Sequence, residues 1–197
     1  MKHMLRTLYV LFPTYIVAFV IALFLATFDV RMGRRTPFVS LAFVHSVPVF
    51  LWSFLLYGLL GRYLGSTMGV TFSIFVAQLS SFYIAIRGIL VTENAPFYML
   101  YAEAYGIYGF RLYMRGIKPA IPHLFQVFAG KLSHVLGGIP FIEIIWRYSG
   151  IGYLTFRAIT SGDLALIRAS VMSVSLLTLI SLILSRLCKD VRHREKS

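Results

Sequence analysis

Three stretches of this chain run for more than twenty residues without a lysine, arginine, aspartate or glutamate. They cover Thr7–Phe28, Thr36–Gly61 and Tyr63–Ile86. A helix needs about 20 apolar residues to cross a hydrocarbon core about 30 Å thick, because it rises about 1.5 Å per residue. Each of the three runs is long and apolar enough to cross a bilayer, so the sequence predicts three membrane-spanning helices.

Two further spans follow in the second half of the chain. One covers roughly Pro119–Ile145 and contains Lys131, and the other covers roughly Ala169–Leu187 and is uncharged up to Arg186. Charged residues make up only 13% of the chain, against about 25% in soluble domains, so a soluble fold would leave too much apolar surface. We therefore expect an all-α polytopic membrane protein, with residues 1–197 forming one transmembrane domain of five helices.

The first apolar run has two interpretations. It is either a secretory signal peptide or a retained span. Its length of about 22 residues and the lack of an A-x-A cleavage site before Asp29 favour a retained span.

The distribution of lysine and arginine predicts the orientation. If the loop after the first span is cytoplasmic, twelve basic residues lie inside and six lie outside, with Lys131 left in the membrane. Basic residues concentrate in cytoplasmic loops of membrane proteins. We therefore expect a multi-pass protein of the inner or plasma membrane, with its N-terminus outside and its C-terminus in the cytoplasm. This topology also explains the net charge of +12 without a nucleic-acid partner.

Motifs for catalysis are missing from the sequence. It has no G-x-x-x-x-G-K-[ST] loop for a nucleoside triphosphate, no G-x-S-x-G elbow, and no H-E-x-x-H or other metal-binding spacing of its five histidines. We therefore expect no enzyme activity, no bound metal and no cofactor on this chain. Energy for any active transport must come from another chain or from an ion gradient.

The segment between the third and fourth spans, about 88–118, carries a periodic pattern. Tyr98, Tyr101, Tyr105 and Tyr108 recur at helical spacing, and arginines and a lysine follow further along. One interpretation is an amphipathic helix in the headgroup layer, with tyrosines at the interface. The other is a docking helix for a soluble partner, in which Gly106 and a second glycine allow close backbone approach.

Residues in and after this segment resemble a known family. Glu103-Ala104-Tyr105-Gly106-Ile107 and Lys118-Pro119-Ala120-Ile121-Pro122 are similar to the cytoplasmic E-A-A-type loop of ABC importer permeases, especially the dipeptide/oligopeptide/nickel family. Several further matches keep that family's order and spacing: Arg34-Arg35, Ser46-Val47-Pro48, Gly137-Gly138, Glu143, Ser149-Gly150-Ile151-Gly152, Ala158 and Asp163.

The chain also departs from the family pattern. Tyr105 replaces a small or basic residue, and Ser149 replaces a proline. The chain resembles members of the family from their second span onward, and what remains is similar to the five-helix core of methionine-type importers.

The resemblance implies a permease subunit of a type I ABC importer for peptides or similar small solutes. Its coupling loop would contact a cytoplasmic ATPase through Glu103, Ala104, Gly106, Ile107, Phe110, Arg111 and Arg115. The implied partners are a second permease of a different chain, two ATPase subunits that hold ATP and Mg, and an extracytoplasmic substrate-binding protein. The alternative is a non-ABC transporter subunit or a membrane assembly or scaffold protein.

Lys131 lies near mid-membrane, ten residues after Ile121. A lysine there costs about 2.5–3.5 kcal/mol on insertion scales, and it needs water or a partner. Glu143 is about 18 Å further along the same helix, which is too far to pair with it. Snorkelling or an acid on a partner subunit is one interpretation. The other is a wet translocation path, in which Lys131 and His134 meet a substrate carboxylate.

Gly137, Gly138 and Pro140 follow on the same predicted helix. Proline removes a hydrogen bond and clashes with the preceding turn, so we expect a break or kink here. The kink is either a gate hinge or a static bend.

The orientation has a direct test in the single cysteine, Cys188, which follows the last apolar run. We expect a membrane-impermeant maleimide to label Cys188 in inverted membrane vesicles and not in intact cells, because this end is predicted to be cytoplasmic. A Cys188→Ser variant gives the background. Labelling of intact cells would contradict the orientation.

Overall fold

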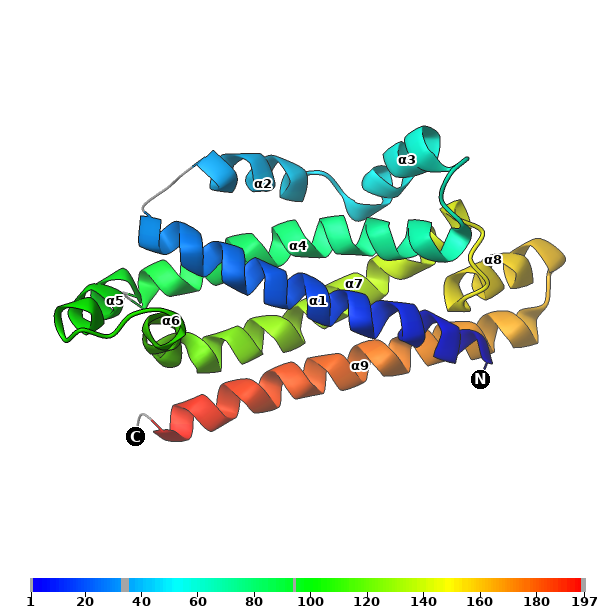
Figure 1. The fold of residues 1–197 in the computed structure, drawn as a ribbon. Helices are drawn as coiled ribbons and strands as arrows, with labels where there is room; N and C mark the ends of the chain where they lie inside the picture. Colours follow the sequence, from blue (N-terminus) through cyan, green and yellow to red (C-terminus); the bar gives the residue numbers. More distant parts are fainter. Residues whose placement is uncertain (1, 33–35, 94, 196–197) are drawn as a thin grey trace.

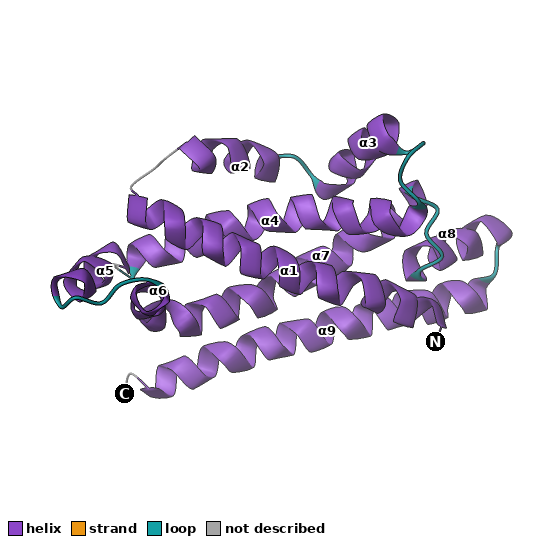
Figure 2. Cartoon of the chain, in the orientation of Figure 1, coloured by secondary structure: helices purple, strands orange, loops and turns teal. Residues whose placement is uncertain are grey.

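The computed structural model describes residues 2–32, 36–93 and 95–195, and all the regular structure in these ranges is helical (Figures 1 and 2). No strand occurs in these ranges, which confirms the all-α expectation. The elements are α1 (Lys2–Met32), α2 (Thr36–Ser46), α3 (Val49–Leu60), α4 (Ser66–Thr92), α5 (Ala95–Ala104), α6 (Phe110–Ile117), the 3-10 helix η1 (Lys118–Ala120), α7 (Ile121–Ile145), α8 (Ile151–Ser161) and α9 (Leu164–Glu195).

Four long apolar helices form the body of the molecule. Among the described residues, four segments have the length and composition to cross a membrane: Lys2–Met32, Ser66–Thr92, Phe110–Ile145 and Leu164–Ile183. They run along one common axis in Figure 1, with α1 packed on α4 and α7 packed on α9. The predicted first, third, fourth and fifth spans correspond to these segments.

The predicted second span, 36–61, is not one helix. It is divided into α2 and α3, and Val47-Pro48 lies between them. Neither piece alone has the length of a span, but the pair returns the chain from one end of the bundle to the other (Figure 1). The path of the chain therefore keeps five passes along the bundle axis, of which the second is broken.

The two ends of the bundle carry different parts of the chain. The short helices α5 and α6 lie at the end where α9 finishes, while the N-terminus and α8 lie at the opposite end (Figure 1). This arrangement places the segment 88–118 and the C-terminus together, as the predicted orientation requires. The predicted R-R loop, Arg34-Arg35, lies outside the described residues.

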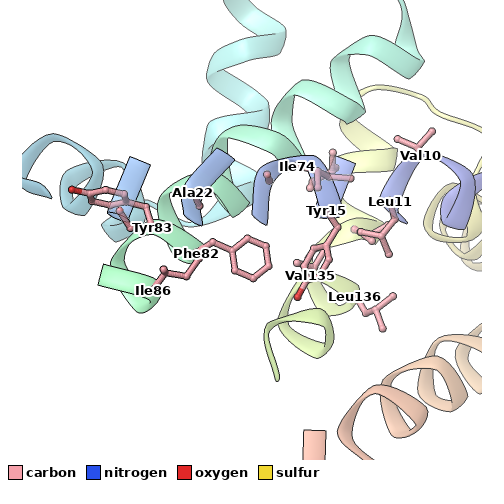
Figure 3. Close-up of a cluster of buried hydrophobic side chains, with 14 of the residues drawn as sticks. Val10, Leu11, Tyr15, Ala22, Ile74, Phe82, Tyr83, Ile86, Val135 and Leu136 are labelled. Carbon is pink, nitrogen blue, oxygen red and sulfur yellow. The ribbon is translucent and has the colours of Figure 1, made fainter. Parts of the chain in front are cut away.

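The centre of the bundle is an aromatic cluster between α1, α4 and α7. Tyr15, Phe19, Phe82 and Phe128 meet edge to face, with ring centroids 4.9–5.1 Å apart around the cluster. The Tyr15 hydroxyl donates to the Phe128 carbonyl at 2.5 Å, so the one polar atom of the cluster has a partner. Figure 3 shows Tyr15 and Phe82 on neighbouring helices within this core.

The helices differ in how much of their surface the fold covers. Half of the spanning window of α4 is buried, against 11% for α9, so α4 is the central helix and α9 lies at the periphery. The uncovered side chains are large and apolar, as a surface against lipid or a partner subunit requires. They include Phe12, Ile16, Val20, Phe24, Met172, Leu176 and Leu179.

Removing the buried ring of Phe82 should leave a cavity between α1 and α4. We expect Phe82→Ala to lower the free energy of unfolding by about 3 kcal/mol, the low end of the range for a buried phenylalanine. The low end applies because lipid is as apolar as the core, so the loss comes from packing and not from transfer out of water. Unfolding by denaturing detergent, followed by circular dichroism, measures this. Phe72→Ala on the uncovered face of α4 is the matched control, and an equal loss there would contradict the aromatic core.

Candidate functional site

The break between α2 and α3 follows from one missing hydrogen-bond donor. In a continuous helix, the backbone N–H of residue 48 would donate to the carbonyl of Val44, but Pro48 has no N–H. The indole Nε1 of Trp52 donates to the Val44 carbonyl instead, at 2.9 Å. α3 then starts from Pro48, whose carbonyl accepts from the N–H of Leu51 at 3.0 Å.

A polar cavity of about 330 Å³ lies beneath this break. Its walls come from the end of α2, the start of α3, α4 and α7. The polar side chains that line it are His45, Gln78, Ser80, Ser81, Lys131 and His134. Lys131 and His134, the two candidates for the translocation path, therefore share one cavity.

Lys131 finds its partner on the central helix. Its Nζ donates to the Ser81 hydroxyl at 2.7 Å, and none of the described residues that line the cavity is acidic. Snorkelling is therefore not needed to satisfy this ammonium, although a hydroxyl leaves its charge uncompensated. Gln78, one turn before Ser81 on α4, is 8% exposed, and its Oε1 has no hydrogen-bond partner among the described residues.

The predicted hinge residues have a different outcome. α7 is continuous from Ile121 to Ile145, so the predicted break at Gly137, Gly138 and Pro140 is not present. Pro140 packs against α8, where a Cβ added to Gly152 would lie 2.2 Å from the Pro140 Cα. A hinge role for these three residues stays a prediction.

Glu143 ties three helices together at the end that carries the N-terminus. Its carboxylate accepts from the Thr7 hydroxyl at 2.6 Å and from the backbone N–H of Gly152 at 2.7 Å, and the side chain is 1% exposed. The N–H of Ile151 in turn donates to Thr7 Oγ1 at 3.0 Å. The N-cap of α8, Gly150, has no side chain that could accept from the first N–H groups of the helix. The Glu143 carboxylate and the Thr7 hydroxyl accept from them instead.

The close approach of this carboxylate explains the glycine at position 150. A Cβ there would lie 2.0 Å from Glu143 Oε1. The few residues between Glu143 and Ser149–Gly152 thus form the turn in which the end of α7 packs against the start of α8. These residues serve the fold, and Thr7 is a partner that the sequence pattern did not single out.

The predicted coupling segment is an elbow of two short helices, not one helix. α5 ends at Ala104 and α6 begins at Phe110, with Gly106 at φ +72° and Gly109 at φ +68° between them. Residues other than glycine rarely adopt this conformation. The expectation that Tyr98, Tyr101, Tyr105 and Tyr108 share one helical face is therefore wrong: the first two lie on α5, and the others lie in the turn.

Of the residues predicted to contact an ATPase, Ile107 packs inward and Glu103 pairs with α1, while the others are exposed. Ile107 packs inward against the small cluster of Met99, Ala102 and Leu112, which holds α5 onto α6. The rest of the elbow offers an uncovered surface of aromatic and basic side chains. Its members are Ala104, Tyr105, Gly106, Tyr108, Phe110, Arg111, Met114 and Arg115.

Glu103 connects the elbow to α1. Its Oε1 pairs with Arg31 Nη2 at 2.6 Å, and the Arg31 guanidinium also lies over the Tyr113 ring, 5.6 Å from its centroid. Two residues before Arg31 on α1, the buried carboxylate of Asp29 accepts from the Tyr83 hydroxyl on α4. The end of α1 that is predicted to face the cytoplasm thus makes polar contacts both with the elbow, through Arg31, and with α4, through Asp29.

One more ion pair and one close histidine–carboxylate contact lie at the same end of the bundle. Arg87 Nε is 3.8 Å from Asp29 Oδ2, joining α4 to α1. His123 Nδ1 is 3.2 Å from Glu93 Oε1, joining the start of α7 to the residue that caps α4. The helices next to the elbow are therefore connected by polar contacts, of which Asp29–Arg87 is an ion pair.

The chain is similar over about half of its length to permease proteins of import systems, and this similarity supports the resemblance to importer permeases. The narrower assignment to the dipeptide/oligopeptide/nickel family stays a prediction. No protein-family model matches the chain.

The relatives found are two forms of one protein. The metal-staphylopine import system permease protein CntB of Staphylococcus aureus strain Mu50 is 27% identical over 105 residues, which is 53% of this chain and 34% of the relative. CntB of strain NCTC 8325 is 26% identical over the same extent. The match thus spans about a third of the length of these relatives.

The contact between Arg31 and Glu103 should hold the elbow in place. We expect Glu103→Arg to speed hydrogen exchange in α5 and α6 by a small factor, below about fivefold, because the pair is partly exposed to solvent. The charge swap Arg31→Glu with Glu103→Arg should recover most of the protection. Exchange mass spectrometry measures both, and an equal effect of Arg111→Glu, outside the pair, would contradict this role.

Proposed function

We propose that this chain is the transmembrane permease subunit of an ABC importer for peptides or similar small solutes. The observation that carries the proposal is the exposed elbow of α5 and α6, presented at one end of the bundle and held to α1 by Glu103 and Arg31. Homology to an import system permease supports the same function. The sequence itself holds no phosphate-binding loop, so a separate ATPase supplies the energy.

The elbow has the chemistry of a docking surface for that ATPase. Phe110 is 78% exposed and Tyr105 is 69% exposed, and the arginines of α6 lie beside them. Exposed aromatic side chains with arginine are enriched where proteins bind one another. We assign the contact with the ATPase to this surface.

Coupling follows from how the elbow is anchored. When two ATPase subunits close on ATP and Mg, the elbow moves with them. The ion pair between Glu103 and Arg31 then moves the end of α1 as well. The pairs Asp29–Arg87 and Glu93–His123 pass the displacement to α4 and α7. These helices then alternate between inward-open and outward-open arrangements as rigid bodies.

The solute path lies on the side of the broken pass. The cavity with Lys131 and His134 is bounded by this chain on α2, α3, α4 and α7. A second permease, a different chain, would complete the path, and an extracytoplasmic binding protein would deliver the solute at the end that carries α8. In this arrangement the N-terminus lies outside, and the elbow lies in the cytoplasm.

Co-purification tests the coupling surface. We expect the ATPase subunits to co-purify with the tagged chain from its native membrane, and Ala104→Trp to reduce their recovery several-fold, since a bulky side chain at the exposed end of α5 separates the surfaces. Gly106 is less suitable as a test site, because its φ of +72° would strain any side chain. Arg111→Glu should also reduce recovery.

The control for this test is Tyr63→Trp, at the opposite end of the bundle, where the side chain is 84% exposed. It should leave ATPase recovery unchanged. If no ATPase co-purifies with the wild-type chain, the ABC assignment fails in favour of a non-ABC transporter subunit or scaffold. If Ala104→Trp recovers as much ATPase as the wild type, the docking surface is elsewhere.

A further inference from the structure

The cavity beneath the α2–α3 break points to a particular kind of ligand. We propose that it is a binding subsite for a carboxylate with an N–H donor beside it, in which Lys131 binds the carboxylate and Gln78 accepts from the N–H. The subsite rests on the proposed importer function, because it assigns the solute that the permease passes.

The backbone at the break indicates a wet cavity. Non-helical backbone is tolerated at membrane depth only where it is buried in protein or lines a water-filled space. Val47 and Pro48 form such a segment, and both line the cavity. Discontinuous helices of this kind place polar groups at solute sites in membrane transporters.

The charge on Lys131 sets the sign of the ligand. Its ammonium has three donors, and one of them goes to Ser81. No acidic side chain lines the cavity among the described residues, so the charge is left for an anion. His45 and His134, whose side chains are exposed at the edge of the same cavity, add donors and no negative charge.

The amide of Gln78 adds the second requirement. Its Oε1 is buried without a partner among the described residues, and a buried acceptor left unpaired destabilises a fold by about 1–3 kcal/mol. Gln78 lines the cavity, and the terminal torsion of glutamine is soft, so rotation about it can present this oxygen to a ligand. A ligand N–H would then satisfy it.

The two groups lie close enough for one ligand to reach both. Gln78 and Ser81 are three residues apart on α4, which puts them on one face a single turn apart. Lys131 is held on Ser81, so its ammonium lies about one turn from the amide. The C-terminal residue of a peptide, with its amide N–H next to its carboxylate, has this spacing of groups.

A labelling experiment tests the anion preference without any transport. Ala77, which also lines the cavity, is changed to cysteine in a Cys188→Ser background, and the full chain is placed in lipid nanodiscs. The rates of modification by an anionic and by a cationic methanethiosulfonate are compared. We expect Lys131→Met to lower the anion-to-cation rate ratio on the order of tenfold, because one nearby charge is removed.

Two variants keep this result interpretable. Lys131→Arg should preserve the ratio, because the charge remains, and it shows that the cavity tolerates substitution. Arg157→Met, on the exposed face of α8, should leave the ratio unchanged. An unchanged ratio in Lys131→Met, or no modification of the cysteine by either reagent, would overturn the subsite.

Uptake into vesicles that hold the assembled complex tests the ligand itself. The probes are alanyl-alanine, its C-terminal amide, which lacks the carboxylate, and the depsipeptide alanyl-lactate, which lacks the N–H. In the wild type, we expect apparent affinity to fall about tenfold or more for the amide and by a smaller factor for the depsipeptide. Lys131→Met should abolish the first difference, and Gln78→Leu should abolish the second.

The outcomes separate the subsite from the importer. If all three probes enter the vesicles equally well in wild type and variants, the subsite is wrong, and import of peptides stands. If no probe enters while the labelling ratio depends on Lys131, the anion subsite stands, and peptide import is wrong.

Discussion

A chain inside a bilayer has no water to satisfy its backbone, so each main-chain donor and acceptor must find a partner within the protein or beside a hydrated cavity. Pro48 lies in the middle of a long apolar run and has no N–H to donate, so the Val44 carbonyl needs another partner. The local structure follows from this need. The Val44 carbonyl is satisfied by the Trp52 indole, the chain restarts as a second short helix, and the space left beneath the break is lined by polar side chains. The position of Lys131 is understandable only with this cavity, because a lysine facing lipid at this depth would be costly.

Polar contacts elsewhere are concentrated at the two ends of the bundle and serve different purposes. At the end that carries α8, the Glu143 carboxylate replaces the missing N-cap of that helix and is fully buried, so it fixes geometry. At the opposite end the Arg31–Glu103 pair is partly exposed, and such pairs contribute little to stability because water and salt screen the two charges. A tight end and a loosely held end are what a bundle needs if one end is to move against a partner while the other keeps its packing.

The sequence predicts the helical class and the approximate bounds of four long helices, because uncharged length is a direct physical requirement of the bilayer. It also brings Lys131 and His134 to one side of α7, because helical spacing alone decides which residues share a face. It does not predict Ser81 and Gln78, which are ordinary polar residues on α4 until the fold places them across from Lys131. Tyrosine periodicity continues across Gly106 and so predicts one helix through the elbow, because the positive φ of Gly106 is a backbone property that periodicity does not reveal.

The contact between Thr7 and Glu143 has a consequence for biogenesis. The two residues are 136 positions apart in the chain, so a ribosome that adds about 5–20 residues per second finishes Thr7 on the order of ten seconds before it reaches Glu143. During that interval the Thr7 hydroxyl lacks the carboxylate that it binds in the finished protein. The N–H groups at the start of α8 are likewise capped only when an earlier part of the nascent chain meets a later one. The last step of tertiary assembly at this end is therefore the docking of an early helix onto a late one.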